Sequence, residues 1–198
     1  IYSHSHADHI AGGEVFADTA SVVAHEQAKA RIARDNVPTA VPQITFAERM
    51  SIELGGKTVE LHYLGRNHSD NLIVMRFPAE RVLFVVDLVA PRRLPYRDFP
   101  DGHVDDWIAS LQAIEAMDFE ILAPGHGALG GKADVAEHRG YLELLRTRVK
   151  TEIDAGKPLD QIKRTVTMPE YESWGAYRDW LELNVEGMYR YLRAGGGN

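Results

Sequence analysis

The stretch His4-Ser5-His6-Ala7-Asp8-His9 follows directly on the short apolar start of the chain and holds three imidazoles and one carboxylate. Imidazole nitrogens and carboxylate oxygens are ligands that suit Zn²⁺ and neighbouring first-row metals, and desolvating so many of them together is costly. A histidine-rich tag is a poor explanation, because this run alternates, contains an aspartate and leads into an apolar helical pattern. The stretch therefore predicts a metal site.

The alternation of this stretch predicts how its side chains are arranged. In an extended segment His4, His6 and Asp8 point to one side, and the chain must then turn for His9 to join them. An ion held by His4 and His6 needs a further protein ligand and an open position for water. A second ion held by Asp8 and His9 needs ligands from elsewhere. One turn can thus serve two metals, and more ligands are expected downstream.

Three polar residues downstream lie where a strand pattern meets a turn. His68 falls in a polar turn between two strand-like segments, and His126 lies in a glycine turn after a third. Asp87 ends the apolar run 82–86, where a buried carboxylate needs a partner. Each residue alone has an ordinary structural explanation, but after the opening cluster the three are expected to complete a metal site.

This ordered pattern resembles the signature of the metallo-β-lactamase-fold superfamily, a His-x-His-x-Asp-His motif followed by a His, an Asp and a His at strand ends. The resemblance covers residues 4–126 and implies an α/β fold, the αββα sandwich of that superfamily. It also implies a dinuclear site, with His4, His6 and His68 on one metal, Asp8, His9 and His126 on the other, and Asp87 bridging both.

The bridging aspartate is similar to that of glyoxalase II and related hydrolases. Because the chain has no cysteine, the Cys-type lactamase site is excluded. Two zinc ions are the expected cofactors, with Fe²⁺ and Mn²⁺ as alternatives, and a hydroxide shared between two ions would attack the carbonyl of an ester, thioester, lactone or lactam. Asp8 is the predicted catalytic residue, since it could orient that nucleophile by accepting a hydrogen bond.

Other functions remain open at this point. A persulfide dioxygenase of the same fold would use one iron held by His4, His68 and Asp87, and a β-lactamase is a further alternative. A non-catalytic metal-binding domain fits less well, because structural zinc sites are normally closed and mononuclear.

Composition favours a globular enzyme acting on a small molecule. The chain has 198 residues, of which 44% are hydrophobic and 26% charged, so it can bury a sizeable core. The chain is mildly acidic, with 22 Lys and Arg against 29 Asp and Glu, so nucleic acid is not the expected partner. No stretch is apolar enough to span a membrane. A homo-oligomer is compatible with the sequence, which leaves the compartment undecided between cytoplasm and periplasm.

We expect a catalytic domain over residues 1–131 and a C-terminal helical region over 132–198 packed on it. Members of the family ordinarily carry several strands before the His-rich motif, so we expect these N-terminal strands to be missing from the sequence as given. Helices are expected over 10–16, 26–34, 104–117, 135–153, 159–164 and 174–192, and strands over 21–24, 50–54, 58–64, 72–77, 82–86 and 121–122.

Substrate recognition is expected in the basic, aromatic loop that follows Asp87. Arg92 and Arg93 could bind an anionic group, and Tyr96 could donate to an oxyanion. The apolar residues of the helix expected over 104–117 are interpreted as core, as are the aromatic residues of the C-terminal region.

The remaining polar residues are given structural or surface roles. Ser5 and Ser69 are interpreted as hydroxyls that orient ligands. His62 is expected to be structural within a strand, and the other three histidines are expected on the surface: His25, His103 and His138.

Overall fold

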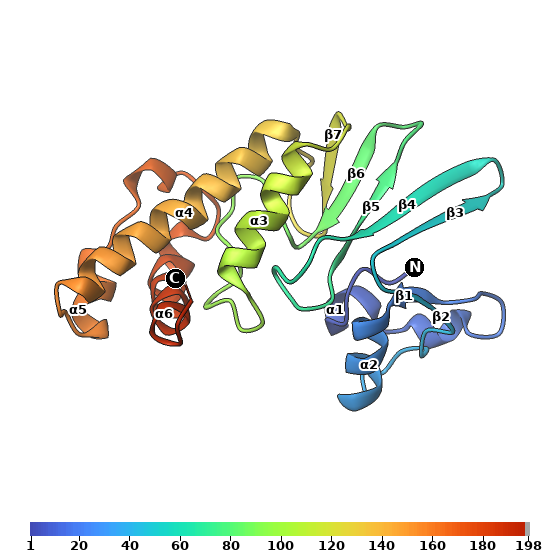
Figure 1. The fold of residues 1–198 in the computed structure, drawn as a ribbon, viewed down its shortest axis with the longest axis horizontal. Helices are drawn as coiled ribbons and strands as arrows, with labels where there is room; N and C mark the ends of the chain where they lie inside the picture. The colour runs from blue at the N-terminus through green and yellow to red at the C-terminus, as the bar shows by residue number, and fades with distance from the viewer. Residues whose placement is uncertain (197–198) are drawn as a thin grey trace.

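The computed structural model describes residues 1–196 and is organised around a five-stranded sheet (Figure 1). Its strands lie in chain order: β3 (Arg49–Leu54), β4 (Lys57–Tyr63), β5 (Ile73–Phe77), β6 (Val82–Val86) and β7 (Ile121–Pro124). The first four pair antiparallel, whereas β6 and β7 pair parallel. The hairpin between β3 and β4 turns on Gly55 and Gly56, which both adopt positive φ, as a tight two-residue turn requires.

A second, two-stranded sheet pairs β1 (Val23–His25) with β2 (Ile44–Phe46) in parallel, and helix α2 (Glu26–Arg34) connects them. The remaining helices are α1 (Ala7–Ile10), η1 (Gly13–Phe16), α3 (Val104–Glu115), α4 (Lys132–Asp154), α5 (Leu159–Thr165), η2 (Pro169–Tyr171) and α6 (Tyr177–Arg193), where η marks a 3-10 helix.

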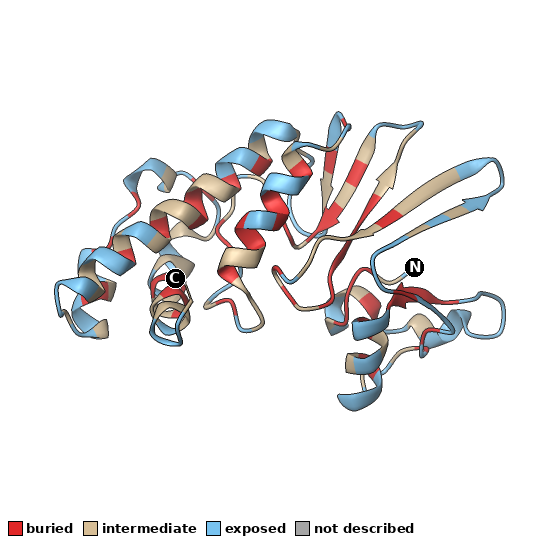
Figure 2. Cartoon of the chain, viewed as in Figure 1, coloured by how far each residue is buried: buried red, intermediate tan, exposed pale blue. Residues whose placement is uncertain are grey.

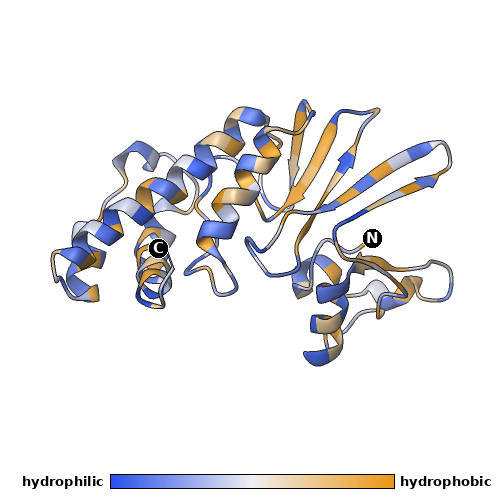
Figure 3. Cartoon of the chain, viewed as in Figure 1, coloured by the Kyte–Doolittle hydropathy of each residue, from blue (hydrophilic) through white to orange (hydrophobic). Residues whose placement is uncertain are grey.

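Strand β5 contributes to a core on each face of the large sheet, because its side chains alternate between the two faces. Ile73 and Met75 pack with Val23 and Phe46 of the small sheet. Leu72 and Val74, on the other face, belong to a larger core that includes residues of α3, α4 and α6. Figure 2 shows these buried positions along β5, β6 and the inner face of α3, and Figure 3 shows the same strands as the most hydrophobic part of the chain.

The layers therefore run from α2 through the small sheet and the large sheet to α3, which confirms the predicted αββα arrangement. Most strands and long helices fall within a few residues of the predicted ranges. Among the described residues 1–196, no helix is long and apolar enough to cross a membrane.

The chain after the His-rich stretch differs from prediction. The helix expected over 10–16 is replaced by α1 and η1, because Gly12 has a φ of +85°, which interrupts the helical path. Asp8 consequently lies in the first turn of α1 rather than in an extended segment. The short strand β2 was not predicted; a run of three residues carries too little periodicity to be recognised.

Two histidines expected on the surface are buried, so that expectation was wrong. His25 is 1% exposed, stacks on Tyr63 and donates a hydrogen bond from Nε2 to Ala47 O at 2.7 Å. His138 is also 1% exposed and lies between Trp107 and Trp174. His103 is half-buried at the start of α3, and His62 is half-buried in β4.

Candidate metal centre

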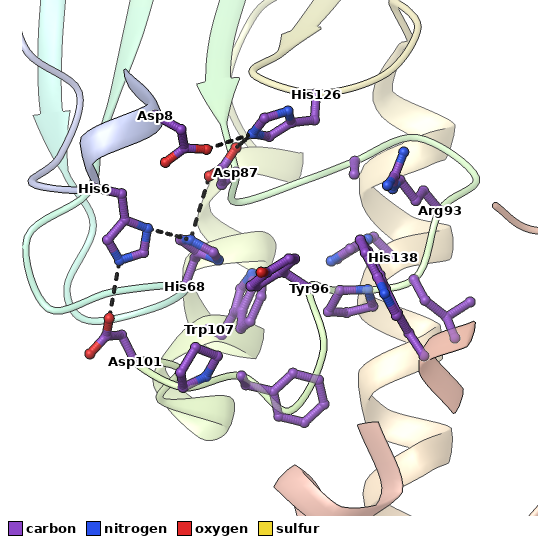
Figure 4. A pocket seen from close by; sticks show the side chains of 16 residues that line it. His6, Asp8, His68, Asp87, Arg93, Tyr96, Asp101, Trp107, His126 and His138 are labelled. Carbon is purple, nitrogen blue, oxygen red and sulfur yellow. Dashed lines mark hydrogen bonds and ion pairs between the residues drawn. The ribbon is translucent and has the colours of Figure 1, made fainter. Parts of the chain in front are cut away.

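Five segments meet at one edge of the large sheet. β4, β6 and β7 run in the same direction, so the residues that follow them emerge at the same edge: His68 after β4, Asp87 directly after β6 and His126 after β7. The extended start of the chain and α1 bring the His-rich stretch to this edge (Figure 4). All seven residues predicted as ligands are therefore brought together.

The first group consists of His4, His6, His68 and Asp87, whose candidate ligand atoms all lie within 4.8 Å of one another. His6 Nδ1 is 3.2 Å from His68 Nε2. Asp87 Oδ2 lies 3.6 Å from His4 Nε2 and 3.5 Å from His68 Nε2. Three imidazole nitrogens and one carboxylate oxygen are thus close enough to one another to bind a single metal ion.

The second group consists of Asp8, His9, Asp87 and His126. Asp87 Oδ2 is 2.9 Å from His9 Nε2, and Asp87 Oδ1 is 3.7 Å from His126 Nε2. Asp8 Oδ2 lies 3.3 Å from His9 Nε2 and 3.1 Å from His126 Nε2. Asp87 therefore belongs to both groups of candidate ligands.

Burial lowers the pKa of two histidines in the first group. It lowers the pKa of His4 well below the usual value and that of His68 to about 4, so both imidazoles are neutral at pH 7 and offer a lone pair. Burial also raises the pKa of Asp87, but a hydrogen bond from His9 and the charges of His68, His9 and His126 outweigh that effect and lower it.

Two buried atoms without hydrogen-bond partners show that this set of side chains fits a metal ion. His4 Nε2 and Asp87 Oδ1 are buried and have no hydrogen-bond partner among the described residues. Leaving such atoms unpaired costs free energy, whereas a divalent ion would satisfy both. Neutral imidazoles with an ionised carboxylate are the form in which these side chains bind metal.

The backbone around Asp87 is built to present this carboxylate. Strand β6 is irregular between Phe84 and Val86, and Val86 has a φ of +53°, which is strained for a β-branched residue. Gly125 packs against the site: a Cβ there would come within 2.8 Å of both Asp87 Oδ1 and His9 Cε1. Only glycine allows the turn before His126 to approach so closely.

Asp101 is a site residue that the sequence did not reveal. Its Oδ2 lies 3.1 Å from His6 Nε2, and Arg31 lies 3.5 Å from its other oxygen. A proton on Nε2, held by this carboxylate, leaves His6 Nδ1 free to bind metal. Asp101 lies in an irregular loop 14 residues after Asp87 in the chain, and no motif marks it.

The serines contribute differently from expectation. Ser3 Oγ, rather than a predicted serine, lies 3.1 Å from His4 Nδ1 and can fix that ring. Ser5 and Ser69 instead contact Asn71, which accepts a hydrogen bond from the Ser5 backbone N–H at 2.8 Å. Ser5 and Asn71 thereby tie the His-rich stretch to the start of the β5 region.

A pocket of about 550 Å³ opens on the metal centre and extends toward α4 and α6. Of the three residues predicted to bind substrate, Arg93 and Tyr96 line this pocket and the exposed Arg92 does not, so their role in substrate binding stays a prediction. Trp107 and Trp180, which were interpreted as core, also contribute to the pocket wall. Figure 4 shows His6, His68, Asp8 and His126 grouped on one side and Arg93 and His138 nearer α4.

The model of the metallo-β-lactamase superfamily matches residues 1–126, and the chain belongs to this superfamily. The matched range includes all seven candidate ligands. The C-terminal helices, including Trp180, lie outside it.

Two curated relatives are similar over part of the chain. The 2,4-dinitroanisole O-demethylase subunit alpha of Nocardioides sp. (strain JS1661) is 32% identical over 64% of this chain and 39% of that subunit. A metallo-beta-lactamase type 2 of Bacteroides fragilis is 28% identical over 50% of this chain and 40% of that enzyme. The matched part of the chain thus spans less than half the length of either relative.

A solved metallo-beta-lactamase from Pontibacter korlensis has the same fold. It superposes with a TM-score of 0.64 at 22% identity, covering 72% of this chain and 67% of that one. This structure and the Bacteroides fragilis relative are both named as metallo-beta-lactamases.

Proposed function

We propose that this protein is a hydrolase that uses two zinc ions to cleave an ester, thioester, lactone or lactam. The observation that carries the proposal is the shared Asp87 carboxylate, which belongs to both groups of candidate ligands. Structural zinc sites are normally mononuclear and closed, whereas these two groups border an open pocket.

Two bound zinc ions would supply a hydroxide nucleophile near neutral pH and polarise the carbonyl that it attacks. His4, His6 and His68 would hold the first ion, and Asp8, His9 and His126 the second, with Asp87 between them. Because imidazoles bind metal in their neutral form, the two aspartates would be the negative charges of the ligand set, so a net positive charge would remain to stabilise a developing oxyanion.

The exposure of Asp8 to the pocket supports a role in orienting the nucleophile. Its side chain is 58% exposed and lines the pocket, while Oδ2 is held 3.1 Å from His126 Nε2. The second carboxylate oxygen can therefore accept a hydrogen bond from a water in the pocket and orient it. Asp101 positions His6 but has no such role, because its Oδ2 lies beside His6 Nε2, on the side of the ring away from His68.

Cleavage of an activated aryl ether is a second candidate. The name of the demethylase subunit, the curated relative with 32% identity, indicates an aromatic methyl ether as substrate. The pocket of this chain includes the aromatic side chains Tyr96, Phe99, Trp107 and Trp180, which suit a planar aromatic group. A β-lactam is a further candidate, since another relative is a β-lactamase.

The reaction is tested with the zinc-loaded protein and a panel of 4-nitrophenyl acetate, a thioester, a lactone, a β-lactam and 2,4-dinitroanisole. We expect hydrolysis of at least one carbonyl substrate and a loss of about 100-fold or more in kcat/KM for Asp8→Ala. Asp18→Ala, which removes an exposed aspartate outside the pocket, is the matched control and should retain activity. Full activity of Asp8→Ala would contradict the role of Asp8.

A further inference from the structure

Arg93 carries the permanent positive charge of the pocket, whose other lining residues include neither lysine nor arginine. Its guanidinium lies 4.8 Å from the centroid of the Trp180 ring. Among residues 1–196, no carboxylate forms an ion pair with it, although the chain has a net charge of −7. A cation that lines a pocket without an acidic partner can bind an anion there.

Aromatic rings line the pocket that Arg93 borders. Tyr96 packs edge-on against Trp180, with ring centroids 5.3 Å apart. Phe99 and Trp107 are also perpendicular to each other, with centroids 6.4 Å apart, and both line the pocket. These rings form an apolar wall that suits a flat group.

The loop that carries Arg93 is fixed by backbone contacts. Leu94 N–H donates to Gly175 O at 3.1 Å, and Gly175 N–H donates to Arg92 O at 2.9 Å. Asn184 of α6 donates to Pro95 O at 3.0 Å. These bonds fix the backbone of Arg93 relative to the C-terminal region that carries Trp180. The guanidinium of Arg93 is therefore pre-organised, unlike that of an arginine on a mobile surface loop.

We propose that Arg93, Trp180 and Tyr96 form a subsite for a planar aromatic group that carries a negative charge. This inference rests on the proposed function, because the charged aromatic group would be part of the substrate that is cleaved at the metal centre. Trp180 lies outside the family match, so the subsite is built partly by the C-terminal region of this chain.

The subsite is tested by binding rather than by turnover. Isothermal titration of the zinc-loaded protein compares 2-naphthalenesulfonate with the uncharged 2-naphthalenemethanol. We expect the sulfonate to bind about tenfold or more tightly, as a charge-assisted hydrogen bond predicts. Arg93→Gln should remove this preference while changing the affinity for the uncharged probe less than about twofold, and Trp180→Leu should weaken binding of both probes.

Arg92→Gln is the matched control, because it removes the same charge from the adjacent exposed residue. It should retain the preference for the sulfonate, which shows that local contact and not net charge is responsible. Equal affinities of the wild-type protein for the two probes would overturn the proposal, as would an equal loss of preference in Arg92→Gln and Arg93→Gln. Thermal unfolding of each variant verifies that it is folded.

This experiment is independent of the reaction. If the sulfonate preference depends on Arg93 but no substrate of the panel is hydrolysed, the subsite stands and the proposed reaction fails. If hydrolysis occurs and the preference is absent, the reaction stands and the subsite fails.

Discussion

His138 of α4 is a buried imidazole whose two nitrogens have no hydrogen-bond partner among the described residues. Burial lowers its pKa from 6.5 to about 4. Between these values the unfolded chain binds a proton that the folded protein excludes. The contribution of the buried, neutral His138 to the free energy of unfolding is therefore fully present above pH 6.5 and is lost as the pH falls toward 4.

His138→Leu should therefore make the fold less sensitive to acid. Between pH 7 and pH 4.5 we expect the free energy of unfolding to fall by roughly 2 to 3 kcal/mol less in the variant than in the wild type. Chemical denaturation at the two pH values measures this difference, and the metal-site histidines cancel because both proteins contain them. Identical losses in the two proteins would show that His138 is protonated equally in the folded and unfolded states.

The candidate ligands were predictable at this scale, whereas the residues that support them were not. The spacing of His4, His6, Asp8 and His9 is local, so the sequence displays it directly. Asp101 reaches His6 only because the loop after β6 folds back, and this depends on tertiary contacts that no local pattern encodes. The burial of His138 likewise depends on its neighbours in space.

At the scale of elements, α6 fixes the loop over residues 88–100. Asn184 is fully buried, donates to Pro95 O and Arg97 O, and accepts a hydrogen bond from the Tyr141 hydroxyl at 2.7 Å. Gly187 lies so close to this loop that a Cβ there would approach Asp98 O to 2.3 Å. The loop that follows Asp87 is thus bound to the C-terminal region over much of its length.

Asn184→Leu should destabilise the protein, because it removes the donor to the carbonyls of Pro95 and Arg97 and leaves the buried Tyr141 hydroxyl without its acceptor. We expect a loss of about 2 to 4 kcal/mol in the free energy of unfolding, measured by denaturant titration. Tyr141→Phe removes only the bond to the Asn184 side-chain oxygen and should cost about 1 kcal/mol. An Asn184→Leu loss no larger than that of Tyr141→Phe would contradict this role of the loop contacts.

The strands of the large sheet were predictable because each presents apolar residues over several positions. The three-residue strand β2 was missed, and Gly12 sets the path from α1 to η1, where propensity over a window predicted a single helix. The equally short β1 was predicted as a strand over 21–24. The start of α6 at Tyr177 rather than at 174 reflects the left-handed conformation of Ala176, which no pattern indicated.

At the scale of the whole molecule, one core extends from the large sheet through α3 to α4 and α6. The pocket follows the same path: its metal end lies within the family match, and Trp180 and His138 come from the region beyond it. The division at residue 131 remains a prediction, as do a homo-oligomer, a small-molecule partner and the native metal.

The most direct test of the account is the metal content of the purified protein, determined by elemental analysis together with protein concentration. The two groups of candidate ligands, which share Asp87, predict close to two zinc ions per chain. The variant His126→Ala removes a ligand of the second group alone and should hold about one zinc ion per chain. One ion or none in the wild-type protein under zinc-replete conditions would contradict the dinuclear site and, with it, the proposed reaction.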